Sequence, residues 1–205
     1  MTDASPPAMC PLFLGGHPAV DFLNTALAPR GTVIELIGDG RAYVDWLAAA
    51  GLLDRETAST LTRRFGVKAI DAAAEEARRV REWARGWLSR WRTAPRGNYR
   101  AEVTELNKLL EREAVRREVI PERAGMKVVE RPRIETANAL VGLVAMQIAA
   151  LVTQEQPSLL KHCAGSACTL WFLDRTKAHR RLFCSATACG NRAKVSAFRR
   201  RQREG

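Results

Sequence analysis

The chain has 205 residues, of which 46% are hydrophobic, and a formal net charge of +11. This length suits one large domain, or a medium domain followed by a small module. The longest apolar stretch, residues 139–152, is shorter than the roughly 18 residues of a membrane span, and the first eight residues lack the features of a signal peptide. We therefore expect a cytoplasmic protein with no membrane partner.

The first predicted helix carries several polar side chains. Pro18 suits the first turn of a helix, which we expect over about 18–27, before a strand over 32–37. Four polar residues on or beside this helix are candidates to line a pocket for an unknown small ligand: His17, Asp21, Asn24 and Thr25. The alternative is that they cap the helix and hold the preceding Gly15-Gly16 turn as satisfied buried groups. The sequence leaves both interpretations open.

The middle of the chain is predicted to be mostly helical. Asp39 and Asp54 have the residue types and positions of helix caps. The helices are expected over these ranges: 40–50, 55–65, 67–93 and 99–117. The long helix has an apolar face at spacings of three and four: Val80, Trp83, Trp87, Leu88 and Trp91. The helix after it is expected to turn these side chains inward: Val103, Leu106, Leu109 and Leu110.

The last part of the predicted N-terminal domain combines a little β-structure with a buried helix. Residues 126–134 are expected to form a strand or one arm of a hairpin. Residues 135–154 form an almost wholly apolar segment, which predicts a central, buried helix. The fold class is therefore mainly α with minor β (α+β), with a helical domain over 12–156 and a small C-terminal module over 157–205.

The C-terminal module has the cysteine pattern of a metal site. Four of the five cysteines form two pairs with the same x4 spacing: Cys163, Cys168, Cys184 and Cys189. Zinc binds four thiolates in a tetrahedron, and such a site supplies folding energy to a short segment. We predict one structural Zn²⁺ per chain and treat Cys10 as unrelated. Buried free thiols, disulfides, or a ligand from His162 or His179 are the alternatives, but the symmetry of the pairs favours four cysteines.

Four thiolates leave the zinc no open coordination position, which a catalytic zinc requires. Asp174 is the only carboxylate near the pairs, and no spacing of nucleophile and base is visible. We therefore expect no enzymatic activity. Residues 169–183, between the two pairs, are expected to form a hairpin and a small apolar cluster beside the metal.

The segment after the last cysteine is predicted to be a basic helix. Residues 161–205 hold eleven Lys and Arg residues against two acidic ones, a net charge of +9. Asn191 is a possible cap, and Val195 and Phe198 are expected to pack back on the module. Basic residues of this helix and of the preceding loop are predicted to contact a polyanion: Arg175, Arg180, Arg181, Arg192, Lys194, Arg199, Arg200 and Arg203. Ser196 shares the stripe of Arg192, Arg199 and Arg203. A solvated basic tail without a partner is the alternative.

Basic charge on a zinc scaffold does not by itself select the partner. Guanidinium groups bind phosphate and also recognise guanine edges, which fits double-stranded DNA. An RNA-binding module and a protein-interaction module are the competing hypotheses, and a homodimer is compatible with the sequence.

Several motifs resemble a known pair of domains. The C-terminal motifs resemble the CGNR zinc-finger family: Cys163-x4-Cys168, Phe172-x-Asp174 and Cys184-x4-Cys189-Gly-Asn-Arg-Ala-Lys194. Residues 13–25 and 46–53 resemble the ABATE domain, which usually precedes that finger. The resemblance implies a treble-clef finger that binds DNA, in a stress-induced transcription regulator whose N-terminal domain is a candidate sensor. Leu182 and Ala186 depart from the family, which commonly has bulkier residues there.

Overall fold

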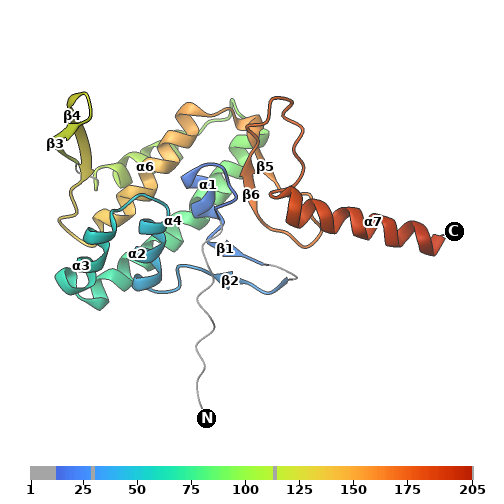
Figure 1. Ribbon diagram of the computed structural model, residues 1–205, viewed down its shortest axis with the longest axis horizontal. Helices are drawn as coiled ribbons and strands as arrows, with labels where there is room; N and C mark the ends of the chain where they lie inside the picture. Colours follow the sequence, from blue (N-terminus) through green and yellow to red (C-terminus); the bar gives the residue numbers. More distant parts are fainter. Residues whose placement is uncertain (1–12, 29–30, 113–114, 205) are drawn as a thin grey trace, which may run out of the picture.

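Helices form most of the protein, in a computed structural model that describes residues 13–28, 31–112 and 115–204. Cys10 lies outside the described residues. The main elements follow in chain order (Figure 1): α1 (Pro18–Leu23), β1 (Ala26–Leu27), β2 (Ile34–Glu35), α2 (Gly40–Ala49), α3 (Arg55–Phe65), α4 (Val67–Thr93), α5 (Arg100–Leu110), β3 (Val115–Glu122), β4 (Gly125–Pro132), α6 (Ala139–Gln154), β5 (Leu160–His162), β6 (Trp171–Leu173) and α7 (Asn191–Glu204). Two short turns, η2 (Pro157–Leu159) and η3 (Ala186–Gly190), flank the last two strands. The strands form three two-stranded antiparallel sheets, so the predicted α+β class is confirmed. None of the described helices is long and apolar enough to cross a membrane.

The core lies between α4 and α6. The buried face of α4 includes Val80, Trp87, Leu88 and Trp91 of the predicted apolar face, while Trp83 is only partly buried. Almost every residue of the first half of α6 is buried. The Tyr43 hydroxyl of α2 donates to the carbonyl oxygen of Leu140 at 2.9 Å, which ties the smaller helix to this centre. The prediction that the apolar helix is central is confirmed.

Local signals placed several helix boundaries correctly. The Asp39 carboxylate accepts a hydrogen bond from the amide of Ala42 at 2.8 Å, and the Asp54 carboxylate accepts one from the amide of Thr57 at 2.7 Å. Each bond satisfies an otherwise unpaired donor of the first helical turn. Helices α2, α3 and α4 therefore begin at or within a residue of their predicted positions.

Other boundaries were predicted wrongly. Helix α1 ends at Leu23 because Ala26 pairs with Glu35 in a short antiparallel sheet instead of continuing the helix. The helix expected over 99–117 ends at Leu110, and Val103 on it is exposed instead of inward. Residues 115–122 form β3, which pairs along its whole length with β4. Helix α6 starts at Ala139 instead of residue 135.

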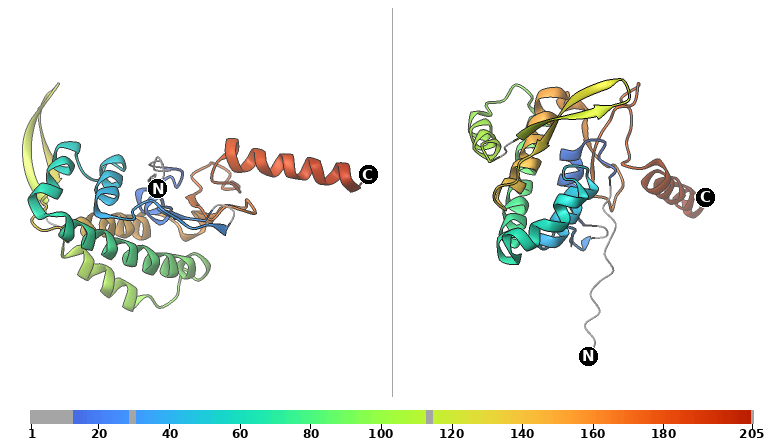
Figure 2. Two further views of the ribbon diagram at one scale, coloured as in Figure 1. Left: turned by 90° about the horizontal axis from the view of Figure 1, so that it is seen from below. Right: turned by 60° about the vertical axis from the view of Figure 1, so that its left-hand side comes forward.

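The C-terminal segment is attached to the helical core through β6. Trp171 and Leu173 belong to the main core cluster, and the Leu173 amide donates to the carbonyl oxygen of Gly15 at 2.7 Å. Gly15 also has no room for a side chain, because a Cβ there would lie 2.9 Å from the Asp21 amide nitrogen. Helix α7 in contrast extends away from the rest of the molecule (Figures 1 and 2).

Candidate metal centre and nucleic-acid interface

The four paired cysteines meet at one point. The sulfur atoms of Cys163, Cys168, Cys184 and Cys189 all lie within 4.8 Å of one another. The Cys168 and Cys184 sulfurs are 3.7 Å apart, and those of Cys184 and Cys189 are 3.6 Å apart. A tetrahedron with Zn–S bonds of 2.3 Å has edges of about 3.8 Å. The four cysteines therefore form a site for one zinc ion.

The first pair is held by a turn between β5 and β6. The Cys163 amide donates to the carbonyl oxygen of Leu170, and the Cys168 amide donates to that of Gly165, each at 2.9 Å. A Cβ at Gly165 would lie 3.3 Å from the Cys168 Cβ and 3.6 Å from two of the sulfurs. Glycine at this position therefore lets the turn close tightly over the metal site.

The second pair is held by a turn that continues into α7. The Cys184 amide donates to the Cys163 sulfur at 3.3 Å, which links the two pairs directly. Cys189 lies in the η3 turn, whose first residues are capped by the Ser185 hydroxyl, an acceptor for the Ala188 amide at 3.1 Å. The hairpin expected within 169–183 was misplaced. The paired strands β5 and β6 enclose the first cysteine pair instead, and Leu182 is exposed.

The ionisation of the thiols reflects their crowding. Burial, together with the neighbouring sulfurs, raises the pKa of the Cys168 thiol to about 11. Burial acts in the same direction on Cys163, but amide donors from Cys184 and Gly165 outweigh it and lower the pKa of that thiol. A divalent cation at the centre supplies the positive charge that four adjacent thiolates need, and its binding releases their protons.

The nearby histidines and the lone carboxylate have other partners. The His162 ring lies 3.8 Å from the Trp171 ring, centroid to centroid, and His179 contacts the Asp174 carbonyl oxygen through Nδ1 at 3.1 Å. Neither histidine belongs to the ligand cluster found among the described residues. The Asp174 carboxylate is fully buried, and it accepts hydrogen bonds from Lys161 at 2.7 Å and the Arg181 amide at 2.8 Å.

Asp174 is therefore the residue that organises the loop between the two cysteine pairs. Burial opposes ionisation, but the hydrogen bonds from Lys161, Thr176 and Arg181 prevail and hold the pKa of this carboxyl well below its usual value. From the sequence, no structural role was predicted for Asp174, which was noted as the carboxylate near the zinc and as part of one family motif. Its Phe172-x-Asp174 motif was the available signal for a structural role.

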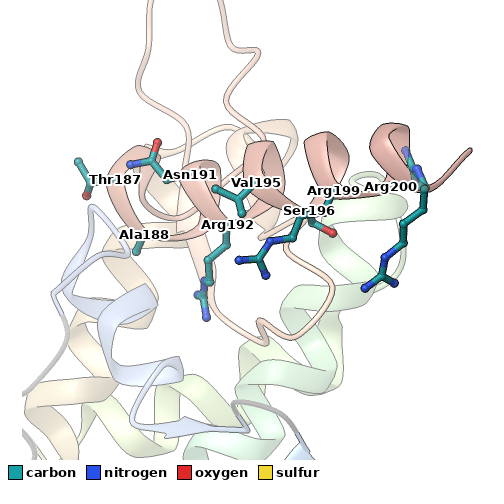
Figure 3. Close-up of a pocket in the computed structure, with 9 residues that line it drawn as sticks. Thr187, Ala188, Asn191, Arg192, Val195, Ser196, Arg199 and Arg200 are labelled. Carbon is teal, nitrogen blue, oxygen red and sulfur yellow. The ribbon is translucent and has the colours of Figure 1, made fainter. Parts of the chain in front are cut away.

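The basic helix α7 begins directly after η3. Asn191 does not cap it, because η3 supplies the preceding turn and Ser185 is the cap. Arg192 donates to the Cys189 sulfur at 3.0 Å, so the first turn of α7 contacts the metal site. Three arginines of the predicted stripe line an open groove along the helix (Figure 3): Arg192, Arg199 and Arg203. Ser196 of the same stripe lines it too, together with Val195 and Arg200, which were not part of the predicted stripe. In Figure 3, Arg192 and Arg199 extend from the same side of α7.

The apolar side chains of α7 were predicted wrongly. Val195 is 49% exposed and Phe198 is 56% exposed, so neither packs back on the module. The reason is the direction of α7, which leaves the zinc site and extends into solvent (Figure 2). Most of the circumference of the helix is therefore exposed to solvent.

The other basic residues have different surroundings. Arg180 and Lys194 are exposed. Arg181 lies over the Phe172 ring at 4.5 Å and donates to the carbonyl oxygens of Phe183, at 2.8 Å, and Cys184. Arg175 forms an ion pair with Glu155 at the end of α6. Two of the three predicted loop arginines thus also have partners within the chain.

The four polar residues near α1 are buried and bonded within the protein. His17 caps α1 by accepting from the Ala19 amide at 3.1 Å, and Asp21 accepts from the Gly15 amide at 2.7 Å. Asn24 both donates to and accepts from the main chain of Trp171, at 2.9 and 2.8 Å. Thr25 donates to the Phe22 carbonyl oxygen and accepts from Arg81. These contacts fit the alternative interpretation of caps and satisfied polar groups.

Burial also affects the titration of two of these residues. Asp21 is 7% exposed, and burial raises the pKa of its carboxyl to about 6, even though the amides of Gly15 and Leu14 act in the opposite direction. Burial, with a contribution from the Arg175 charge, lowers the pKa of His17.

Two family models match separate segments of the chain. Residues 16–155 match the family model of ABATE, described as "Putative stress-induced transcription regulator". Residues 160–202 match the CGNR zinc finger, the segment that contains all four clustered cysteines and most of α7. No curated protein matches the chain. Because the first match spans well over half of the sequence, the chain belongs to the ABATE family and carries a CGNR zinc finger at its C-terminal end.

Proposed function

We propose that this protein is a transcription regulator that binds double-stranded DNA through α7, with a structural zinc ion fixing the helix to the rest of the protein. The observation that carries the proposal is the protruding helix, whose arginines Arg192, Arg199, Arg200 and Arg203 line one groove. An α-helix fits the major groove of B-DNA, which is about 12 Å wide. The zinc role is structural because four thiolates fill the coordination sphere.

Charge supports a nucleic-acid partner for this end of the molecule. The finger carries a formal charge of +9, and a zinc ion with four thiolates lowers it by about two. Among the residues that α7 contributes to the groove, none is acidic. Arginines that replace counterions on phosphates make affinity fall steeply with salt concentration.

A small ligand is not part of the proposal. Two of the residues expected to line a sensor pocket, Asp21 and Asn24, form hydrogen bonds with the main chain of the protein itself. Their geometry supports a role in joining α1 to the preceding turn and to β6.

The test is a binding measurement with two matched triple variants of the zinc-loaded protein. Duplexes selected from a random pool are titrated with the wild type, with Arg199→Ala/Arg200→Ala/Arg203→Ala, and with Arg55→Ala/Arg63→Ala/Arg64→Ala. The second variant removes the same charge from exposed arginines of α3. We expect the α7 variant to lose affinity and to have a shallower salt dependence by about 0.9 per lost phosphate contact, while the α3 variant binds as the wild type.

Equal binding by the α7 variant and the wild type would refute the proposal. Competition between the selected duplex and structured RNA separates the two nucleic acids, and preference for RNA would replace DNA as the partner. If the protein bound neither nucleic acid, the protein-interaction hypothesis would take precedence.

A further inference from the structure

The β3–β4 hairpin exposes an apolar face at the end of the molecule opposite α7 (Figure 1). Directly opposite residues of the two strands share a face, and alternate residues along each strand point to the same side. The register pairs Val115 with Pro132, Val119 with Val128, and Pro121 with Met126. All six residues therefore lie on one face, which we call the outer face.

The apolar side chains of the outer face are highly exposed. The exposed fraction is 65% for Val119, 81% for Met126 and 63% for Val128, and Val115 is 44% exposed. Among the described residues, no other two neighbouring helices or strands expose as many large apolar side chains as β3 and β4 do. The opposite face of the hairpin includes Glu118 and Arg131, which line a groove with residues of α3, so the outer face is directed away from the protein.

Such a face is unusual for a hairpin on its own. Two strands without a third are at best marginally stable in water, and clustered exposed apolar groups mark interaction surfaces. A short loop would be enough to connect α5 to α6. Instead the chain extends two strands of eight residues each, about 27 Å long at 3.4 Å per residue.

The charges of the hairpin indicate what kind of partner fits. Four ion pairs lie within it, and Glu118 is shared by two of them: Arg116–Glu118, Arg117–Glu130, Lys127–Glu122 and Arg131–Glu118. This contrasts with the α7 arginines that line the groove, for which the described part of the chain shows no ion pair. The hairpin is therefore suited to a partner that is apolar and close to neutral, unlike a nucleic acid.

The outer face is also complementary to itself. Arg117 and Glu130 face each other across the strands at 2.9 Å, and both belong to the outer face. A two-fold axis that runs parallel to the strands, between two stacked outer faces, brings Arg117 of one copy to Glu130 of the other, in the self-complementary manner of a symmetric dimer. We propose that the outer face of the β3–β4 hairpin is the surface through which two copies of this chain associate.

The association is expected to be reversible, because a single two-stranded face is at the small end of specific interfaces. Analytical ultracentrifugation of the full zinc-loaded chain, without nucleic acid, measures the dimer dissociation constant. Val128→Glu should raise it by about a hundredfold, since each dimer buries this valine twice and each buried copy contributes about tenfold. Val67→Glu is the matched control, because Val67 is also 63% exposed but lies on α4, and it should leave the constant unchanged.

A charge exchange tests the geometry without removing apolar groups. Arg117→Glu and Glu130→Arg should each weaken self-association by at least about tenfold, because like charges then face each other twice in the dimer. An equimolar mixture of the two variants should form heterodimers, and the double variant should recover the wild-type constant. Each reversal affects only an exposed ion pair, so the fold should be retained.

A wild-type chain that remains monomeric at its highest soluble concentration would overturn the proposal. So would a dimer that Val128→Glu leaves unchanged, or a mixture of the charge variants that fails to associate. Because no nucleic acid is present, these outcomes do not depend on whether α7 binds DNA.

Discussion

The Asn24 side chain connects the helical core to the zinc finger through two hydrogen bonds. Its side-chain nitrogen donates to the Trp171 carbonyl oxygen at 2.9 Å, and its side-chain oxygen accepts from the Trp171 amide at 2.8 Å. Asn24 is 1% exposed and Trp171 is 4% exposed. Water therefore cannot easily replace these bonds once the side chain is removed.

The cost of removing the Asn24 side chain follows from these two bonds. Asn24→Ala leaves one buried donor and one buried acceptor of Trp171 without partners, and each unsatisfied buried group costs about 1–3 kcal/mol. We expect the free energy of unfolding to fall by about 2–6 kcal/mol, a large part of the roughly 5–15 kcal/mol of a typical domain.

Urea unfolding of the zinc-loaded protein, monitored by tryptophan fluorescence and by circular dichroism, measures the change. Amide hydrogen exchange gives a local readout, because the Trp171 amide should lose protection before the amides of α4 do. Asn107→Ala is the control, since Asn107 is exposed on α5 and should change stability by less than about 0.5 kcal/mol. Equal stability of Asn24→Ala and the wild type would show that β6 is held in place by other contacts.

Three further predictions concern the metal, a buried carboxyl and a buried ion pair. Cys168→Ser should bind less than one equivalent of zinc per chain, and α7 should unfold while most of the helical circular dichroism signal remains. A full equivalent of zinc in this variant, measured by metal analysis, would contradict the ligand assignment. The pKa of Asp21 is raised to about 6, so the wild-type protein loses stability as this carboxyl ionises between about pH 4 and pH 6. The free energy of unfolding of Asp21→Asn should therefore rise relative to that of the wild type by about 2–3 kcal/mol between pH 4 and 7. A difference in urea unfolding that does not change with pH would exclude this. Glu35→Gln leaves the buried Arg81 guanidinium without its bidentate partner at 2.6 and 2.7 Å, which should lower the free energy of unfolding by about 3–5 kcal/mol. Glu82→Gln, on the exposed side of the same arginine, should lower it by less than about 1 kcal/mol. Equal shifts of the melting temperature for the two variants would argue against the pairing.

Features encoded within a few residues could be predicted from the sequence. Asp39 and Asp54 act on amides three residues later, so the sequence pattern alone indicated both caps. The four cysteines were predictable because the metal imposes one geometry on two equal spacings. The central position of α6 followed from the lack of any polar face.

Features that depend on distant contacts could not. The sequence before β3 continues a helical pattern, and only pairing with β4 thirteen residues away, as between Arg117 and Glu130, makes 115–122 a strand. Val195 and Phe198 have helical spacing typical of a packed face, but α7 follows the η3 turn with both side chains exposed. The partner of Asn24 is 147 residues away in the chain, so nothing local distinguished a structural amide from a ligand-binding one.

The attachment of β6 also has a consequence for how this protein tolerates mutation. On the β6 side, the bonds to Gly15 and Asn24 come from main-chain groups of Leu173 and Trp171. Every amino acid except proline supplies those groups, so these hydrogen bonds survive most substitutions in β6. In the helical core, the same hydrogen bonds require the amide side chain of Asn24 and a residue without a Cβ at position 15. Deep mutational scanning should therefore find a one-sided pattern, with positions 15 and 24 nearly invariant and the strand they bind constrained mainly by its packing.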